Sequence, residues 1–265
     1  MKYNNPFPQT IAEKIAGQTP VLDTVGESDS AVLLYTDCVL KTEPTNENSN
    51  REYAALRWLK NRLPVPEVLD FVQEHGQNFL LMSKLHGTMA SDRIADAVED
   101  TVKVLADGLQ KLWRIDISNC PLQSTLDIRL QQAKQNIENG LVDTDDFEPD
   151  TLGANGFADV HALYAYLVQN QPTEDLVFTH GDYCLPNIFT ENGKATGFLD
   201  LGKAGIADRW QDIALCVRSL EHNICGLCKL QKEEFLHAKA LLYAELGITE
   251  DAEKLKYYIL LDELF

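Results

Sequence analysis

Short apolar runs separated by polar turn residues fill the first part of the chain, as is typical of antiparallel strands. Four strands are expected, at residues 31–35, 38–41, 68–72 and 78–83. Between the second and the third, Tyr53, Leu56 and Leu59 recur at helical spacing, and we expect Asn50 to be the N-cap of that helix. Leu63-Pro-Val-Pro66 ends it. The pattern predicts a small antiparallel sheet with one helix.

From about residue 90 the apolar residues recur every three or four positions, which indicates amphipathic helices. The longest is marked by Val98, Val102, Leu105, Leu109 and Leu112. Further helices are expected at residues 126–138, 159–167, 213–220, 233–246 and 252–264. Three β-prone runs interrupt them, at residues 176–179, 187–190 and 195–199. The expected fold class is α+β, with a sheet lobe at 1–83, a hinge at 84–88 and a larger, mainly helical lobe at 89–265. A ligand cleft is expected between the lobes.

The chain is strongly acidic, with 41 acidic and 23 basic residues and a net charge of −18. This charge makes nucleic acid a poor partner and attracts cations. No run of about 18 apolar residues is present, and residues 1–6 lack the layout of a signal peptide. We therefore expect no membrane span, a cytoplasmic location and reduced thiols at the six cysteines.

The most informative motif is His180-Gly-Asp-Tyr-Cys-Leu-Pro-Asn187, followed thirteen residues later by Asp200-Leu-Gly202. The spacing of its histidine, aspartate and asparagine matches the catalytic loop of protein kinases. Asp182 is suited to orient an acceptor hydroxyl and take its proton, whereas Asn187 and Asp200 offer the hard oxygen ligands that Mg²⁺ prefers. Each residue alone could be an ordinary turn or capping residue. Their combination after a β-prone run predicts a kinase-like phosphotransferase.

The chain resembles the aminoglycoside 3′-phosphotransferases, which are resistance kinases with a protein-kinase-like fold. The residues that carry the resemblance are His180–Asn187, Gly197–Asp208, Gln211-Asp-Ile-Ala214 and Leu260–Phe265. The resemblance implies a bilobal fold and transfer of the γ-phosphoryl of ATP or GTP, with Mg²⁺, to the 3′-hydroxyl of kanamycin- or neomycin-type compounds.

The resemblance also implies a nucleotide site in the first lobe. Lys41 would contact the α- and β-phosphates, and Glu52 would pair with it. Gly17-Gln-Thr-Pro20 resembles the short β1–β2 loop of the family, so Thr19 would cap the γ-phosphate. Backbone groups of Ser83 and Leu85 would bond the adenine edge. Phe189 and Leu199 would line the base pocket. Val39 stands where some relatives carry an aromatic residue, which leaves the choice between ATP and GTP open.

A polycationic substrate requires several carboxylates. The acidic run at 143–150 and the apolar C-terminal helix, which we expect to be docked, resemble the antibiotic-binding parts of the family. Lys203 replaces the arginine that many relatives carry after D-x-G, and Glu221 lies beside His222, where relatives are acidic. The expected substrate contacts are Asp146, Glu148, Asp150, Lys203, Arg218, Glu221, Asp262, Glu263 and Phe265.

Two other functions remain open at this point. One is a choline-, homoserine- or nucleoside-type kinase with the same fold, against which the acidic loop and the C-terminus argue. The other is an inactive kinase-like protein that only sequesters cations. For the aminoglycoside kinase we expect a monomer or a weak dimer.

Overall fold

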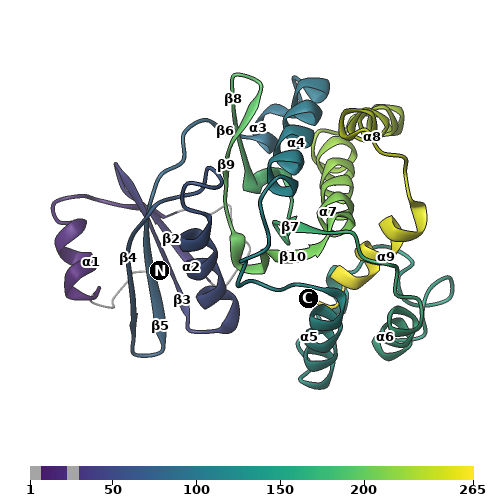
Figure 1. Cartoon of the computed structure of the whole chain (residues 1–265), viewed down its shortest axis with the longest axis horizontal. Coiled ribbons are helices and arrows are strands. Elements are labelled where there is room, and N and C mark those ends of the chain that lie inside the picture. The colour runs from purple at the N-terminus through teal and green to yellow at the C-terminus, as the bar shows by residue number, and fades with distance from the viewer. Residues whose placement is uncertain (1–6, 23–29) are drawn as a thin grey trace.

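The structure is a computed structural model that describes residues 7–22 and 30–265, without the side chains of residues 47, 48 and 146. Two lobes lie side by side in it, a sheet lobe and a larger helical lobe (Figure 1). This arrangement confirms the predicted α+β, bilobal fold. The expectations for residues 1–6 lie outside the described residues.

The first lobe is built on a five-stranded sheet in the order β1-β2-β3-β5-β4. Its strands are β1 (Val21–Leu22), β2 (Ala31–Leu34), β3 (Cys38–Pro44), β4 (Val68–Glu74) and β5 (Gln77–Ser83). All neighbouring strands pair antiparallel, as predicted.

Side chains of β3 alternate between the two faces of this sheet, as the geometry of a strand requires. Cys38 and Leu40 are buried in a small apolar cluster that includes Ile11 of α1 (Gln9–Lys14), a short helix that the sequence pattern does not reveal. Val39 and Lys41 therefore face the opposite side, toward the second lobe. The alternation places the Lys41 ammonium in the space between the lobes.

The helix after β3 is α2 (Glu47–Leu59), and its N-cap is Asn46 rather than the predicted Asn50. Asn46 Oδ1 accepts the Ser49 N–H at 2.8 Å, and Ser49 Oγ accepts the Asn46 N–H at 3.1 Å. This reciprocal pair is a capping box. Because of this capping box, α2 begins at Glu47, before the first residue of the apolar pattern. The apolar spacing does not reveal this start, because the capping residues are polar and lie upstream of the buried positions.

The predicted place of Gly17-Gln-Thr-Pro20 is wrong. These residues lie between α1 and β1, and Thr19 is exposed, whereas the connection from β1 to β2 is formed by residues 23–30. Residues 23–29 are outside the described part of the chain. Because α1 occupies residues 9–14, the first strand begins only at Val21, after the motif at 17–20 rather than before it.

The second lobe is mainly helical and encloses the larger apolar core. Its longer helices are α4 (Val98–Trp113), α5 (Leu126–Glu138), α6 (Val160–Gln169), α7 (Arg209–Glu221), α8 (Lys232–Leu246) and α9 (Ala252–Asp262). Its shorter elements are β6 (Thr88–Met89), α3 (Ala90–Arg93), β7 (Leu176–Thr179), β8 (Ile188–Glu191), β9 (Lys194–Phe198) and β10 (Gly205–Asp208). All the predicted helices and strands are present, with ends that differ by a few residues. Within the described ranges, no helix is long and apolar enough to cross a membrane.

The C-terminal helix α9 is docked, as predicted from its apolar character. Tyr257 Oη donates to the Leu167 carbonyl at 3.0 Å, and Tyr258 Oη donates to Asp208 at 3.0 Å. Lys254 also binds Asp208, at 2.6 Å, and Leu264 is fully buried. The chain end is therefore held against the helical lobe.

Candidate active site

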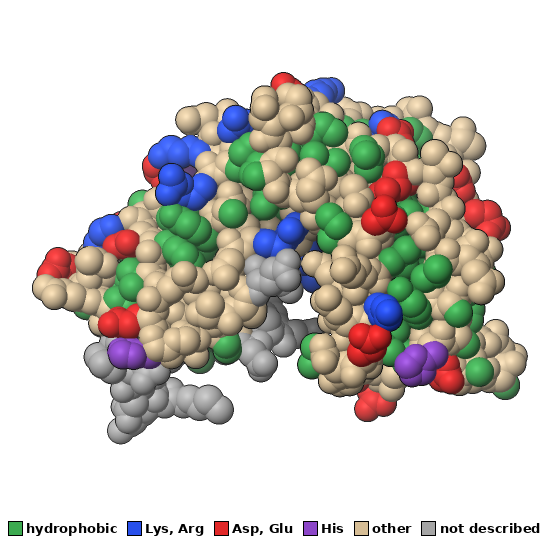
Figure 2. Space-filling view, turned by 60° about the horizontal axis from the view of Figure 1, so that its bottom comes forward, with side chains coloured by type: hydrophobic (Ala, Val, Ile, Leu, Met, Phe, Trp, Pro, Cys, Tyr) green, Lys and Arg blue, Asp and Glu red, His purple; other side chains and the backbone are tan. Residues whose placement is uncertain are grey.

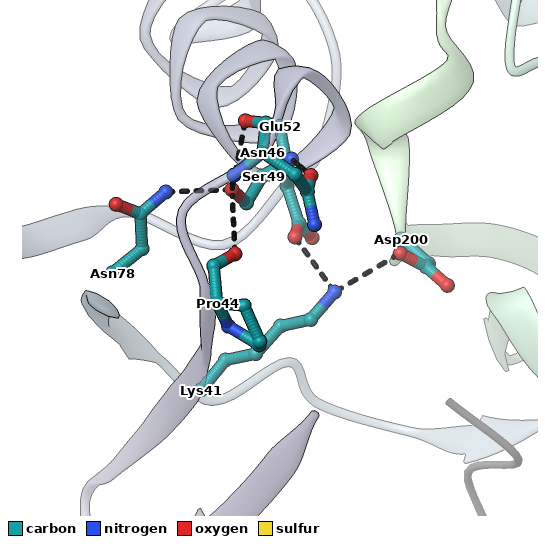
Figure 3. Close-up of polar contacts among 7 residues, drawn as sticks. All are labelled: Lys41, Pro44, Asn46, Ser49, Glu52, Asn78 and Asp200. Atoms are coloured by element: carbon teal, nitrogen blue, oxygen red, sulfur yellow. Dashed lines mark hydrogen bonds and ion pairs between the residues drawn. The ribbon is translucent and has the colours of Figure 1, made fainter. Parts of the chain in front are cut away.

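Lys41 binds one carboxylate from each lobe, Glu52 of its own lobe and Asp200 of the helical lobe (Figure 3). Its Nζ donates to Glu52 Oε2 at 2.8 Å and to Asp200 Oδ1 at 3.2 Å. Burial works against the ammonium, but the charges of Glu52 and Asp200 outweigh it and hold the pKa of Lys41 above its ordinary value. Lys41 is therefore a cation at neutral pH, close to where Asp200 presents its half-exposed carboxylate.

Asp182 and Asn187 are in direct contact. Asn187 Nδ2 donates to Asp182 Oδ2 and to the Asp182 carbonyl, both at 3.0 Å. These bonds orient the Asn187 amide so that its Oδ1 is left for another partner. The second carboxylate oxygen, Asp182 Oδ1, lies 3.1 Å from Cys184 Sγ. The orientation of the Asp182 carboxylate is thus set by two neighbours from its own loop.

The loop that carries Asp182 lies close to the segment that carries Asp200. Leu199 N–H donates to the Asn187 carbonyl at 2.9 Å, which closes the β8–β9 hairpin and brings residues 187 and 200 together. Gly181 has φ +84, and a Cβ there would lie 2.2 Å from the Lys203 carbonyl oxygen. Only glycine tolerates both conditions. The close approach of the two segments therefore requires glycine at this position.

A cavity of about 480 Å³ opens between the lobes (Figure 2). Its lining brings together five residues predicted from the sequence, namely Lys41, Glu52, Asp182, Asp200 and Lys203. Thr19 is not among the residues that line it, and its contact with the γ-phosphate stays a prediction. The polar groups of the cavity come from both lobes.

At the hinge, the Ser83 N–H donates to the Glu67 carbonyl at 2.9 Å, so this one group is not free for a base. Leu85 packs against Gly197, where a Cβ would lie 2.6 Å from Leu85 Cδ1. Phe189 pairs with Gly197 and Met89 in the small second sheet. Neither Ser83, Leu85, Phe189 nor Leu199 lines the described cavity.

The C-terminal acidic residues form a second cluster beside Asp182. Asp262 is partly buried, with 13% of its side chain exposed, and it is ion-paired with Arg218 and, at 3.5 Å, with Arg129. Burial lowers the pKa of Arg129, while the charges of Asp262 and Asp182 oppose this, so both carboxylates act on the same guanidinium. The Arg129 guanidinium also lies 3.7 Å from the centre of the Phe265 ring. The predicted Asp262 is thus bound by two arginines rather than free.

Glu263 links the acidic loop to the chain end. Both of its carboxylate oxygens accept the Glu148 N–H, at 3.1 and 3.2 Å. Burial raises the pKa of Glu263 to about 7, despite that bond and the charge of Arg218. The side chains of Glu148 and Asp150 are exposed, and the side chain of Asp146 is outside the described part. Glu221 pairs with Lys232 and is not bonded to this cluster among the described residues.

Comparison with known proteins agrees with this geometry. Residues 22–246 match the model of the phosphotransferase enzyme family. An aminoglycoside 3′-phosphotransferase of Enterococcus faecalis is 40% identical over 255 residues, which cover 94% of this chain and 91% of that protein. The chain belongs to the aminoglycoside 3′-phosphotransferase family. A second member, from Staphylococcus aureus, is 39% identical over 91% of this chain and 88% of its own length.

Solved structures of aminoglycoside phosphotransferases have the same fold. The crystal structure of aminoglycoside-3′-phosphotransferase of type VIII superposes with a TM-score of 0.77 at 26% identity, covering 97% of both chains. An aminoglycoside phosphotransferase from Streptomyces rimosus gives a TM-score of 0.81 at 24% identity, covering 97% of this chain and 99% of the other.

Within this family member, Asp212 of α7 supports the loop of Asp182. Its two carboxylate oxygens accept the N–H groups of His180, at 2.7 Å, and of Gly181, at 2.9 Å. Burial raises the pKa of Asp212 to about 7, although both N–H bonds act in the opposite direction. Sequence reasoning noted the motif at 211–214 but assigned it no role.

Arg129 was also missed, although the sequence carries a signal for it. It lies on the buried face of α5 together with Leu126, Leu130 and Ala133. A charged residue on the apolar face of a helix is expected to have a buried partner. Asp262, far away in the sequence, supplies that partner.

Proposed function

We propose that this protein transfers the γ-phosphoryl group of a nucleoside triphosphate to the 3′-hydroxyl of an aminoglycoside, with Mg²⁺. The observation that carries the proposal is the meeting of Lys41, Asp182 and Asp200 on one cavity between the lobes. In this reading, residues 1–83 form the nucleotide-binding lobe, residues 84–88 the hinge, and residues 89–265 the catalytic and aminoglycoside-binding lobe.

Each group has a defined part in the transfer. Asp182 orients the acceptor hydroxyl and takes its proton as the new O–P bond forms and the bond to the departing nucleoside diphosphate breaks. Lys41, kept charged by its two carboxylates, binds the phosphates of the donor. The arrangement works mainly by positioning and by neutralising phosphate charge.

The residues present suit Mg²⁺. Asn187 Oδ1, left available by the amide's bonds to Asp182, and the carboxylate of Asp200 are hard oxygen donors. Among the described residues, no group of three or more His, Cys, Asp or Glu side chains could hold a metal ion. Mg²⁺ usually keeps several waters and binds one or two carboxylates together with the phosphates of the substrate. When bound, the ion neutralises charge on the phosphates.

The acceptor side is anionic, in keeping with a polycationic substrate. Glu263, Glu148 and Asp150 lie at the chain end and the neighbouring loop, while Asp262 keeps the end in place through Arg218 and Arg129. This favours an aminoglycoside over the neutral or singly charged acceptors of other small-molecule kinases.

A panel of acceptors tests the proposal directly. Kanamycin should support release of ADP in a coupled assay, whereas a 3′-deoxy analogue should bind but not react, because it lacks the acceptor oxygen. Expression in a susceptible bacterium should give the same pattern in the inhibitory concentrations. Turnover of choline or homoserine without turnover of kanamycin would refute the proposed acceptor.

The raised pKa of Glu263 predicts that aminoglycoside affinity increases with pH. Its pKa of about 7 means that Glu263 is mostly protonated at pH 6 and mostly ionised at pH 8. If the substrate ammonium binds only the ionised form, affinity should fall by up to about tenfold for each pH unit below that value. Calorimetry between pH 6 and 7.5 measures this change.

The matched control is Glu263→Gln, which cannot ionise. The antibiotic's own amines lose their charge as the pH rises, which lowers affinity in both proteins. Subtracting the pH profile of Glu263→Gln removes this contribution. Identical profiles for the two proteins would exclude Glu263 as the titrating contact.

A further inference from the structure

Arg51 lies next to Glu52 on α2 but points across the interface between the lobes. Its Nε donates to the Gly202 carbonyl at 3.3 Å, and its Nη2 donates to the Ala204 carbonyl at 2.9 Å. Both acceptors belong to the segment that directly follows Asp200. Two adjacent residues of α2 therefore make both contacts: Glu52 pairs with Lys41, and Arg51 binds the segment that follows Asp200.

Ser124 completes the tie from the helical lobe. Arg51 Nη2 also donates to Ser124 Oγ at 3.0 Å, and Ser124 Oγ donates to the Lys203 carbonyl at 3.1 Å. The carbonyls of residues 202, 203 and 204 are therefore all engaged, by two side chains from different lobes. The Ser124 N–H binds the Ile206 carbonyl at 2.9 Å, so the segment is held at its far end as well.

Asp200 needs such support, because its backbone is in the left-handed region. Its φ of 56° is unusual for a residue other than glycine, and the surrounding structure must hold it there. The residues that follow Asp200 in the chain are those that Arg51 and Ser124 bind. The network thus acts on the backbone whose conformation decides where the Asp200 carboxylate points.

We propose that Arg51 is a positioning residue that couples α2 to the Asp200 segment and keeps Lys41, Glu52 and Asp200 assembled before any ligand binds. This inference rests on the proposed function, in which Lys41 and Asp200 serve a Mg²⁺-bound triphosphate. In kinases generally, the lysine–glutamate pair and the metal-binding aspartate must be in place together. Here the groups that Arg51 binds on the Asp200 segment are the backbone carbonyls of Gly202 and Ala204, so these contacts require no phosphorylation.

The test compares Arg51→Ala with Arg57→Ala. Arg57 lies on the same helix, is exposed, and donates to Tyr53 Oη within α2 at 2.9 Å, so its loss leaves the interface intact. Two measurements use no aminoglycoside: hydrogen–deuterium exchange of residues 200–206 without ligands, and the Mg²⁺ dependence of binding of a non-hydrolysable triphosphate. Arg51→Ala should speed exchange in this segment and raise the Mg²⁺ concentration for half-maximal binding roughly 10- to 100-fold. Arg57→Ala should match the parent protein in both.

Two further variants sharpen the result. Arg51→Lys should recover little, because one ammonium cannot reproduce the planar guanidinium that reaches the carbonyls of Gln123, Gly202 and Ala204. Ser124→Ala keeps Arg51 and should give a smaller change in the same direction, and it carries the test should Arg51→Ala fail to fold.

If Arg51→Ala and Arg57→Ala show the same hydrogen–deuterium exchange and the same Mg²⁺ dependence, the inference is overturned. If Arg51→Ala does not fold, a Ser124→Ala variant that behaves like the parent protein overturns it. The outcome is separable from the proposed function. A protein that binds nucleotide in an Arg51-dependent way but phosphorylates no aminoglycoside would refute only the acceptor.

Discussion

Replacing Asp182 with asparagine is expected to reduce kcat by about 10²- to 10⁴-fold, the usual contribution of a general base. The change is close in shape, and the remaining carbonyl oxygen can still accept from Asn187 Nδ2, which now contacts Asp182 Oδ2 at 3.0 Å. The amide then faces Cys184 and cannot take a proton. Aminoglycoside and nucleotide binding should change little, because neither depends on proton transfer.

The measurements are ADP release under saturating substrates and calorimetric binding of kanamycin. The control is Cys184→Ala, which removes the neighbour 3.1 Å from Asp182 Oδ1 but leaves the carboxylate, and it should remain within a few-fold of the parent. Parent-like turnover in Asp182→Asn would show that another group takes the proton. Unchanged resistance in bacteria that express Asp182→Ala would favour the rival hypothesis of a protein that only sequesters antibiotic.

The proximity of Asp182, Asn187 and Asp200 was predictable because their relations are local. Asp182 and Asn187 share one loop, and a single hairpin, β8–β9, connects Asn187 to Asp200. Short sequence separations leave few ways to arrange these groups, so spacing alone indicates their convergence. Lys41 follows from the family resemblance, and the alternation of side chains along β3 places it on the face toward the second lobe.

The failures have a common physical origin. Thr19 was misplaced because a short glycine–proline motif says nothing about which strands flank it, and α1 precedes the first strand here. Asn50 was chosen as the N-cap because it adjoins the apolar spacing, whereas Asn46 and Ser49 cap each other outside it. In both cases a short local pattern was used to place a residue relative to a strand or a helix end, which the pattern alone does not determine.

The residues missed entirely are those whose partners are distant in the chain. Arg51 binds carbonyls more than 150 residues away, and Arg129 meets Asp262 at a separation of 133. No local pattern reveals such a partner, although a charge on a buried helix face shows that one must exist. The motif at 211–214 is visible in the sequence, but the acceptor role of Asp212 is not, since it depends on the path of the loop at 180–181.

Asp212→Asn is expected to damage both stability and turnover, because asparagine offers one acceptor where the loop requires two. One of the buried N–H groups of His180 and Gly181 would then face an amide N–H₂. Leaving such a group unsatisfied costs about 1–3 kcal/mol. For a chain of this size, each kcal/mol lowers the midpoint of thermal unfolding by roughly 2–4 °C. A shift of the loop also displaces Asp182, for which a loss of about 100-fold in kcat is expected.

The matched control is Asp107→Asn. Asp107 also accepts a backbone N–H, that of Ala195 at 3.0 Å, but it is partly exposed and pairs with Lys111 at the surface of α4. It should lower the unfolding midpoint less and leave kcat near that of the parent. Comparable losses of kcat in the two variants would mean that general destabilisation, rather than the position of the catalytic loop, limits turnover. A full-rate Asp212→Asn enzyme would show that the loop keeps its shape without this carboxylate.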